Sequence, residues 1–236
     1  MMLKVCGATG PGDVDLLHAA GADLVGLWHG IPGGGANLSL DGLSSLGAAC
    51  LATGALQPVL VTFLNDRDAL LKAADQAGVH WLQLHGYQPP ALVAALKRAA
   101  PELTVIKVLH VRGIDCVERP LIGSYERAGT DLFLLDATTG DGRVGSTGHS
   151  LDSKIVIDLA DRMSLPFLLA GGISADTRQH FDDIVEVLPG VVDHPQFAGV
   201  DVDTAARDMA GQMCSGRVGT IRQHWPSAYL EEEGAA

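Results

Sequence analysis

Two side chains near the start of the chain, Lys4 and Cys6, could together do chemistry. They flank Val5 in an apolar stretch typical of a β-strand, where side chains alternate, so both should point to the same face. An ammonium beside a thiol is a common way to obtain a thiolate base or nucleophile near neutral pH. The glycine-rich loop 7–12 that follows indicates the mouth of a site and not a core.

Other reactive or anion-binding residues also follow apolar runs. Asp136 comes directly after Leu132–Leu135, and Asp201 lies near the end of Gly199–Val202. Gly171 and Gly172 follow a further run and lead into a predicted helix. Glycines let backbone N–H groups approach an anion, which predicts a phosphate site at this turn.

The elements that must position these residues alternate between short apolar runs and segments with helical spacing. Strands are predicted at Leu3–Cys6, Leu24–Trp28, Pro58–Phe63, Trp81–Leu84, Val105–Leu109, Leu132–Leu135, Phe167–Ala170 and Gly199–Val202. Helices are predicted at Asp13–Ala20, Leu40–Leu51, Arg67–Ala77, Pro90–Ala99, Glu118–Ala128, Asp152–Asp161, Asp176–Val187 and Gly216–Trp225. Eight β/α repeats predict an α/β protein with a single (β/α)8 TIM barrel; a doubly wound open sheet is the alternative. In a barrel, all the residues named above meet at the carboxyl ends of the strands.

Composition narrows the class of protein. Of 236 residues, 47% are hydrophobic, which is enough for one large core over residues 1–228, and the acidic tail 229–236 is expected to fray. The net charge of −12 argues against sequence-independent binding to nucleic acid. No apolar run reaches membrane-spanning length, and the start of the chain lacks the pattern of a signal peptide.

The four cysteines, Cys6, Cys50, Cys116 and Cys214, are widely spaced. No Cys-x-x-Cys pair is present, and the histidines show no ligand spacing, so neither a disulfide framework nor a metal site is expected. This usage of cysteine favours a cytoplasmic location.

Seven short blocks, in this order along the chain, resemble the phosphoribosylanthranilate isomerase family of tryptophan biosynthesis. They are Lys4-Val5-Cys6-Gly7, Gly21-Ala22-Asp23-Leu24-Val25-Gly26, Gln83-Leu84-His85-Gly86, Leu134-Leu135-Asp136, Gly145-Ser146-Thr147-Gly148, Leu169-Ala170-Gly171-Gly172-Ile173 and Gly199-Val200-Asp201-Val202. The resemblance spans roughly residues 2 to 225. Each block is short, and it is their order that makes the resemblance specific.

The resemblance implies a TIM barrel that performs an Amadori rearrangement, an aldose–ketose isomerisation of a phosphosugar. It implies Cys6 as general base and Asp136 as general acid, with no cofactor and no metal. We expect Lys4 to lower the pKa of Cys6 toward neutrality, because proton transfer is most efficient when the pKa lies near the working pH.

The resemblance also implies the substrate contacts. Gly171, Gly172 and Thr204 are expected at the phosphate, Asp201 at a sugar hydroxyl, and Lys4 and His85 beside the substrate. The family's arginine for the anthranilate carboxylate lies in a Ser-Pro-Arg-like segment, which is here Gly33-Gly34-Gly35-Ala36-Asn37. Arg143 or Arg207 is expected to take over its role; alternatively, the aromatic amine is not anthranilate. Asp203, where the family has serine, would repel phosphate if it pointed inward.

Other interpretations stay open. The chain could be a paralogue that acts on another aminosugar or phosphosugar conjugate, or a barrel that binds a metabolite without catalysis. Cys6 could be an inert buried thiol. Lys4 and Lys107 lie in apolar strands and could form internal ion pairs at the barrel floor, and Lys107 could form a Schiff base in an aldolase. The sequence does not indicate an oligomeric state.

Overall fold

Eight parallel strands close into a barrel in the computed structural model, which describes residues 1–137, 151–182 and 190–225. The barrel strands are β1 (Met2–Cys6), β2 (Leu24–Trp28), β3 (Gln57–Thr62), β4 (Trp81–Leu84), β5 (Thr104–Arg112), β7 (Leu132–Ala137), β8 (Phe167–Leu169) and β9 (Phe197–Val202). Neighbours follow the order β4-β3-β2-β1-β9-β8-β7-β5, and pairing of β4 with β5 closes the ring. The predicted (β/α)8 barrel is therefore confirmed, and the open-sheet alternative is wrong.

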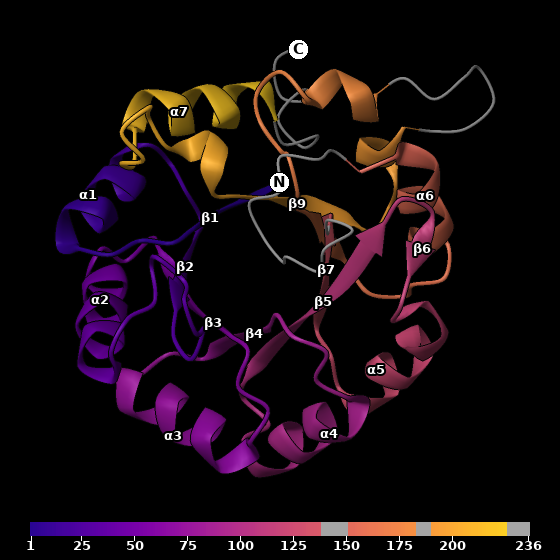
Figure 1. Cartoon of the computed structure of the whole chain (residues 1–236), viewed down its shortest axis with the longest axis horizontal. Helices are drawn as coiled ribbons and strands as arrows, with labels where there is room; N and C mark the ends of the chain where they lie inside the picture. The colour runs from indigo at the N-terminus through magenta and orange to yellow at the C-terminus, as the bar shows by residue number, and fades with distance from the viewer. Residues whose placement is uncertain (138–150, 183–189, 226–236) are drawn as a thin grey trace, which may run out of the picture.

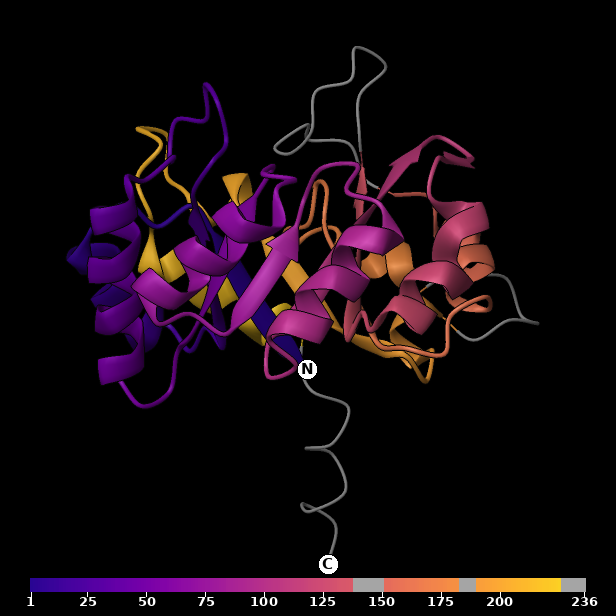
Figure 2. The same cartoon turned by 90° about the horizontal axis from the view of Figure 1, so that it is seen from below.

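A ring of helices covers the barrel, as Figures 1 and 2 show from two directions. The α-helices of the described part are α1 (Pro11–Ala19), α2 (Leu40–Ala52), α3 (Arg67–Ala77), α4 (Pro90–Ala99), α5 (Ile122–Ala128), α6 (Ser153–Ala160) and α7 (Ser215–His224). Short 3-10 helices complete it: η1 (Arg119–Leu121), η2 (Arg178–Phe181), η3 (Val191–Asp193) and η4 (Thr204–Ala206). Within the described ranges, no helix is long and apolar enough to cross a membrane.

Three predicted elements differ from the structure. β5 runs on to Arg112 and turns through Gly113, with φ of +60°, into the unpredicted antiparallel strand β6 (Asp115–Cys116). The predicted helix Glu118–Ala128 is split into η1 and α5, because Pro120 has no N–H to donate. The first part of the predicted helix Asp176–Val187 is instead the 3-10 helix η2. Residues 183–189 and the predicted tail 229–236 lie outside the described residues.

Side-chain alternation sorts the core into two layers. Leu3 and Val5 of β1 pack outward against the helices, and Cys6 belongs to the smaller cluster inside the barrel. In β9, Val200 and Val202 likewise pack outward. Between them Asp201 contacts Lys4, so both of these side chains face the interior.

Candidate active site

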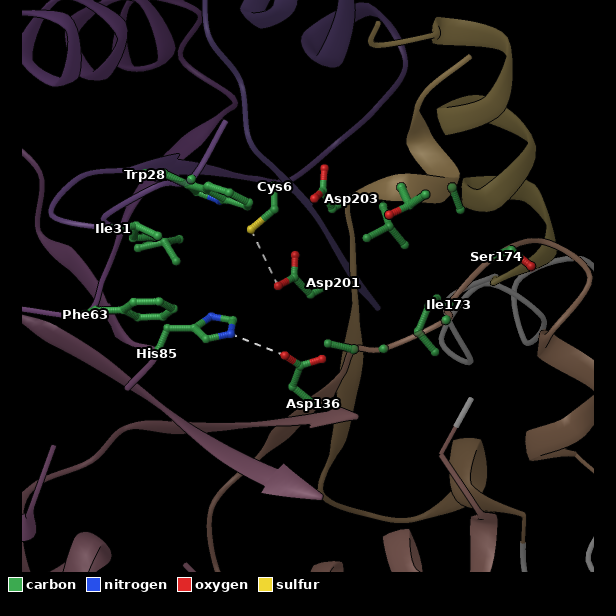
Figure 3. Close-up of a pocket in the computed structure, with 18 of the residues that line it drawn as sticks. Cys6, Trp28, Ile31, Phe63, His85, Asp136, Ile173, Ser174, Asp201 and Asp203 are labelled. Carbon is green, nitrogen blue, oxygen red and sulfur yellow. Dashed lines mark hydrogen bonds and ion pairs between the residues drawn. The ribbon is translucent and has the colours of Figure 1, made fainter. Parts of the chain in front are cut away.

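A cavity of about 770 Å³ opens at the carboxyl ends of the barrel strands. Its described lining comes from the ends of seven barrel strands and the segments that follow them, with no residue of β5. Figure 3 shows Cys6, His85, Asp136 and Asp201 pointing toward one space. Cys6 and Asp136 are 6% and 3% exposed, and both line this cavity. The sequence therefore located both proposed catalytic residues on one cavity, as the acid–base interpretation requires.

Lys4, Cys6 and Asp201 form a buried polar cluster at one side of the cavity. Lys4 Nζ lies 2.7 Å from Cys6 Sγ and 2.8 Å from Asp201 Oδ2. Cys6 Sγ is itself 3.7 Å from Asp201 Oδ2. Strand alternation brings the lysine and the thiol to one face, as expected, and the parallel pairing of β1 with β9 brings the carboxylate to them.

The pKa of Cys6 is raised, whereas the sequence predicted that it would be lowered. Burial raises it, the Asp201 carboxylate raises it further, and Lys4 only partly opposes them, which leaves the pKa of Cys6 at about 12. Burial also raises the pKa of Asp201 despite the nearby ammonium. Burial lowers the pKa of Lys4, but Asp201 and Cys6 outweigh it and hold that pKa above its ordinary value. The ammonium is shared between two partners, so it does not produce a resting thiolate.

On the opposite wall, His85 links Asp136 to a buried glutamine. His85 Nε2 lies 3.2 Å from Asp136 Oδ2, and His85 Nδ1 lies 2.9 Å from Gln83 Nε2. Gln83 lies on β4, His85 directly follows this strand, and Asp136 lies on β7. His85 thus lies beside the candidate acid and lines the cavity.

The glycine turn after β8 lies at one end of the cavity. Gly171 and Gly172 have φ of +75° and +64°, and a Cβ on Gly171 would meet the Ala137 backbone nitrogen at 2.7 Å. Both glycines line the cavity together with Thr204 of η4. Exposed backbone and a hydroxyl at this end suit an anionic group.

Asp203 forms an ion pair with Arg207, and the guanidinium offsets the repulsion that the carboxylate would exert on a bound anion. Arg207 Nε lies 2.7 Å from Asp203 Oδ1, and the guanidinium also donates to the carbonyl of Gly7 at 2.9 Å. Arg207 is held by these contacts and does not line the cavity, which speaks against its predicted role at the substrate's carboxylate. Arg143, the other candidate, lies outside the described residues.

The other end of the cavity is apolar and aromatic. Trp28, Ile31 and Phe63 line it, and Figure 3 places them on the side away from Ile173 and Ser174. The glycine-rich loop after β2 is internally bonded, since Asn37 Oδ1 accepts from the Ile31 N–H at 2.9 Å. Among the described lining residues, this end has no Lys or Arg.

Lys107 does not belong to the site. Its ammonium donates to the carbonyls of Gly86 and Val108 at 2.7 and 2.6 Å, on the outer side of the barrel near Glu118. The side chain is fully buried and does not line the cavity, so the aldolase interpretation is wrong. The alternative of internal ion pairs is confirmed for both lysines, since Lys4 pairs with Asp201 at 2.8 Å and Lys107 with Glu118 at 3.9 Å. Their predicted place at the barrel floor is wrong for Lys4, which lies inside the barrel beside Cys6 at the cavity.

One cation was missed by the sequence interpretation. Arg217, in the first turn of α7, is the one Lys or Arg among the described residues that line the cavity. The Cys214 N–H donates to the Ala206 carbonyl at 2.9 Å, which holds the start of α7 beside η4 and Thr204. The local sequence does not predict that this arginine reaches the cavity. Its position depends on how the segment 207–213 folds back to place α7 beside η4.

Fold and cavity together define a (β/α)8-barrel protein with a thiol and a carboxyl group in one cavity, one end of which is formed by a glycine turn. Residues 47–209 match the family described as N-(5'phosphoribosyl)anthranilate (PRA) isomerase. A relative of that name from Rhodopseudomonas palustris is 32% identical over 74% of this chain and 78% of its own length. The chain belongs to the N-(5'-phosphoribosyl)anthranilate isomerase family.

Solved structures agree on the fold. Phosphoribosyl anthranilate isomerase from Thermus thermophilus matches with a TM-score of 0.75 and 21% identity, over 95% of this chain and 98% of its own. A phosphoribosyl anthranilate isomerase in complex with reduced 1-(o-carboxyphenylamino)-1-deoxyribulose 5-phosphate matches with a TM-score of 0.71 and 20% identity, at the same coverage.

Proposed function

We propose that this chain is a phosphoribosylanthranilate isomerase-type enzyme that performs an Amadori rearrangement on an N-(5-phosphoribosyl) aromatic amine. The observation that carries the proposal is that Cys6 and Asp136, on strands far apart in the sequence, line one cavity of substrate size. Family membership supports the reaction class. An acid and a base at fixed positions are the groups that such a proton-transfer reaction needs.

The two ends of the cavity orient the substrate. The phosphate lies at the end formed by Gly171, Gly172 and Thr204, where Arg217 supplies the positive charge. The aromatic ring lies against Trp28 and Phe63. The ribose then lies between the two ends, beside Cys6, Asp136 and Asp201 (Figure 3).

Asp136 acts first, as the general acid. It protonates the ribose ring oxygen, the C1′–O bond breaks, and the amine lone pair forms the C1′=N iminium. His85 Nε2, 3.2 Å from Asp136 Oδ2, stabilises the carboxylate that remains.

Cys6 acts in its minor thiolate form, after the thiol has lost its proton to solvent. The thiolate removes the C2′ proton and becomes the thiol again, and the electron pair of that C–H bond neutralises the iminium to give an enolamine. Tautomerisation of the enolamine yields the 1-amino-1-deoxyketose. Lys4, 2.7 Å from Cys6 Sγ, stabilises the thiolate when it forms. Asp201 Oδ1 is buried and has no hydrogen-bond partner among the described residues, so it can accept from a sugar hydroxyl.

The test is conversion of phosphoribosylanthranilate by the purified chain, followed by loss of substrate fluorescence. Turnover supports the proposal. If the reduced product analogue binds but no substrate is turned over, the chain is a metabolite-binding barrel instead.

A second candidate function is the same rearrangement on a different amine. The apolar lining around Trp28, Ile31 and Phe63, with no cation among the described residues, favours an uncharged arylamine. A panel of phosphoribosyl arylamines with and without the ortho carboxylate separates the two candidates. A lower KM for the uncharged members identifies a paralogue.

We also propose a cytoplasmic location for the chain. All four cysteines are free, which suits a reducing compartment. The net charge of −12 gives no reason to expect a nucleic acid partner.

A further inference from the structure

Gln83 is a fully buried polar side chain of β4 that does not line the cavity. It lies two residues before His85, so both side chains face the barrel interior. Its amide nitrogen is 2.9 Å from His85 Nδ1. A buried amide inside an apolar barrel is costly, which calls for a function of this contact.

The amide decides where the imidazole carries its proton. An amide N–H that donates to Nδ1 requires a lone pair there, so the neutral ring must carry its hydrogen on Nε2. His85 Nε2 lies 3.2 Å from Asp136 Oδ2, so this hydrogen sits on the ring nitrogen that faces the carboxyl group. In this structure the two atoms are not aligned as a hydrogen bond, and catalytic contacts of this kind tighten when substrate binds. The opposite tautomer would place the Nε2 lone pair against the carboxylate that forms when Asp136 gives up its proton, which is repulsive.

The histidine itself is held in place from a second direction. His110 Nε2 lies 2.9 Å from the His85 carbonyl, and His110 Nδ1 lies 2.6 Å from Glu118. Phe63 packs near the ring with a centroid distance of 5.7 Å. With the main chain and one ring face fixed, the Gln83 contact selects which ring nitrogen is protonated.

We propose that Gln83 is a positioning residue that holds His85 as the Nε2–H tautomer, so that His85 donates to Asp136 Oδ2. This inference rests on the proposed acid role of Asp136. Oδ2 accepts from His85, which leaves Oδ1 to deliver the proton toward the sugar. As that proton leaves, the Nε2–H···Oδ2 bond becomes charge-assisted and strengthens, so the developing carboxylate is stabilised without transfer of a proton from the imidazole.

Four titratable groups surround the imidazole and Gln83. Asp136 approaches from β7, Asp201 from β9, and His110 with Glu118 from the β5–β6 region. None of these groups contacts Nδ1, whose partner among the described residues is Gln83. Substitution of Gln83 therefore changes the proton position on His85 directly.

The test combines ¹⁵N NMR of the ligand-free protein with kinetics of Gln83→Leu and Gln83→Glu. We expect the wild-type His85 to show the Nε2–H tautomer. Gln83→Leu should mix the tautomers. It should lower kcat about tenfold, with KM little changed, which is less than the loss of the general acid itself, about 10²–10⁴-fold. Gln83→Glu should accept from Nδ1–H, remove the hydrogen from Nε2 at high pH and shift the pH profile of kcat.

Gln57→Leu is the matched control, because this amide lies at the opposite end of the neighbouring strand β3 and contacts its own strand at Pro58. It should change neither the His85 spectrum nor kcat. An Nδ1–H tautomer in the wild-type protein overturns the proposal, as does a Gln83→Leu variant with wild-type kcat. The tautomer of the wild-type protein is measured without substrate, so this result does not depend on whether the proposed reaction occurs. It also does not depend on whether a Gln83 variant folds.

Discussion

Lys4 Nζ lies 2.7 Å from Cys6 Sγ, yet the thiol next to this ammonium is held in its neutral form. The reason is that the same ammonium lies 2.8 Å from Asp201 Oδ2, and both burial and that carboxylate raise the pKa of Cys6 to about 12. A base with a high pKa is a strong base once formed, and the cost is a small thiolate fraction in the resting protein.

The first prediction concerns the reactivity of Cys6. Its alkylation by iodoacetamide should be slow near pH 7.5 and should rise about tenfold per pH unit through pH 9, since only the thiolate reacts. Cys214 is partly exposed and serves as the internal reference in the same mass-spectrometric experiment. A Cys6 rate that levels off below pH 8 would show a lowered pKa and contradict the finding.

Removal of the Lys4 ammonium should destabilise the protein, because its partner Asp201 is buried. Lys4→Met leaves the Asp201 carboxylate unpaired in the barrel, and we expect the free energy of unfolding to fall by about 3–5 kcal/mol. Lys4→Met combined with Asp201→Asn should recover part of that loss in urea unfolding. Strict additivity of the two substitutions would mean that the pair is not coupled.

Arg217→Gln should weaken binding of the substrate's phosphate. Loss of one charge-assisted interaction is worth about 1.5–3 kcal/mol, or roughly a 10- to 100-fold rise in the Ki of inorganic phosphate. Arg98→Gln removes the same charge from the exposed face of α4 and should leave Ki unchanged. Equal effects of the two variants on Ki would mean that only the net charge of the protein matters and that Arg217 does not contact the phosphate.

Gly26 makes room for the side chains of Lys4 and Cys6, because it pairs with Cys6 across β1 and β2. A Cβ at this position would lie 3.1 Å from Lys4 Nζ and would press on the Cys6 sulfur. Gly26→Ala should therefore lower kcat/KM at least tenfold, as expected when a catalytic group is displaced. Gly12→Ala, with open space around its Cβ, is the control and should be as active as the wild type.

Local signals explain how much of this structure could be predicted. The bounds of α3 and α4 were predicted correctly because Asp66 caps the first, Gly78 ends it, and Pro90 begins the second. The β5–β6 hairpin was missed because its short second strand has no apolar pattern of its own. Helical spacing alone predicts one helix over Glu118–Ala128, whereas Pro120, which has no N–H to donate, lies in the separate 3-10 turn η1.

The candidate site was predictable where strand order alone places a residue. Cys6, Asp136 and Asp201 come from strand ends, so the barrel brings them together. The different places of Arg207 and Arg217 depend on tertiary structure. The path of the segment between them leaves Arg207 paired with Asp203 and Arg217 at the cavity. The pKa of Cys6 was mispredicted because the contribution of Asp201 and of burial cannot be read from Lys4 and Cys6 alone.

The most direct test of the acid–base pair measures two properties of Cys6→Ala and Asp136→Asn side by side: turnover of phosphoribosylanthranilate and binding of the reduced product analogue. Loss of a general acid or base predicts a fall in kcat of about 10²–10⁴-fold in each variant, with the analogue's Kd retained. Wild-type turnover by either variant would remove that residue from the mechanism.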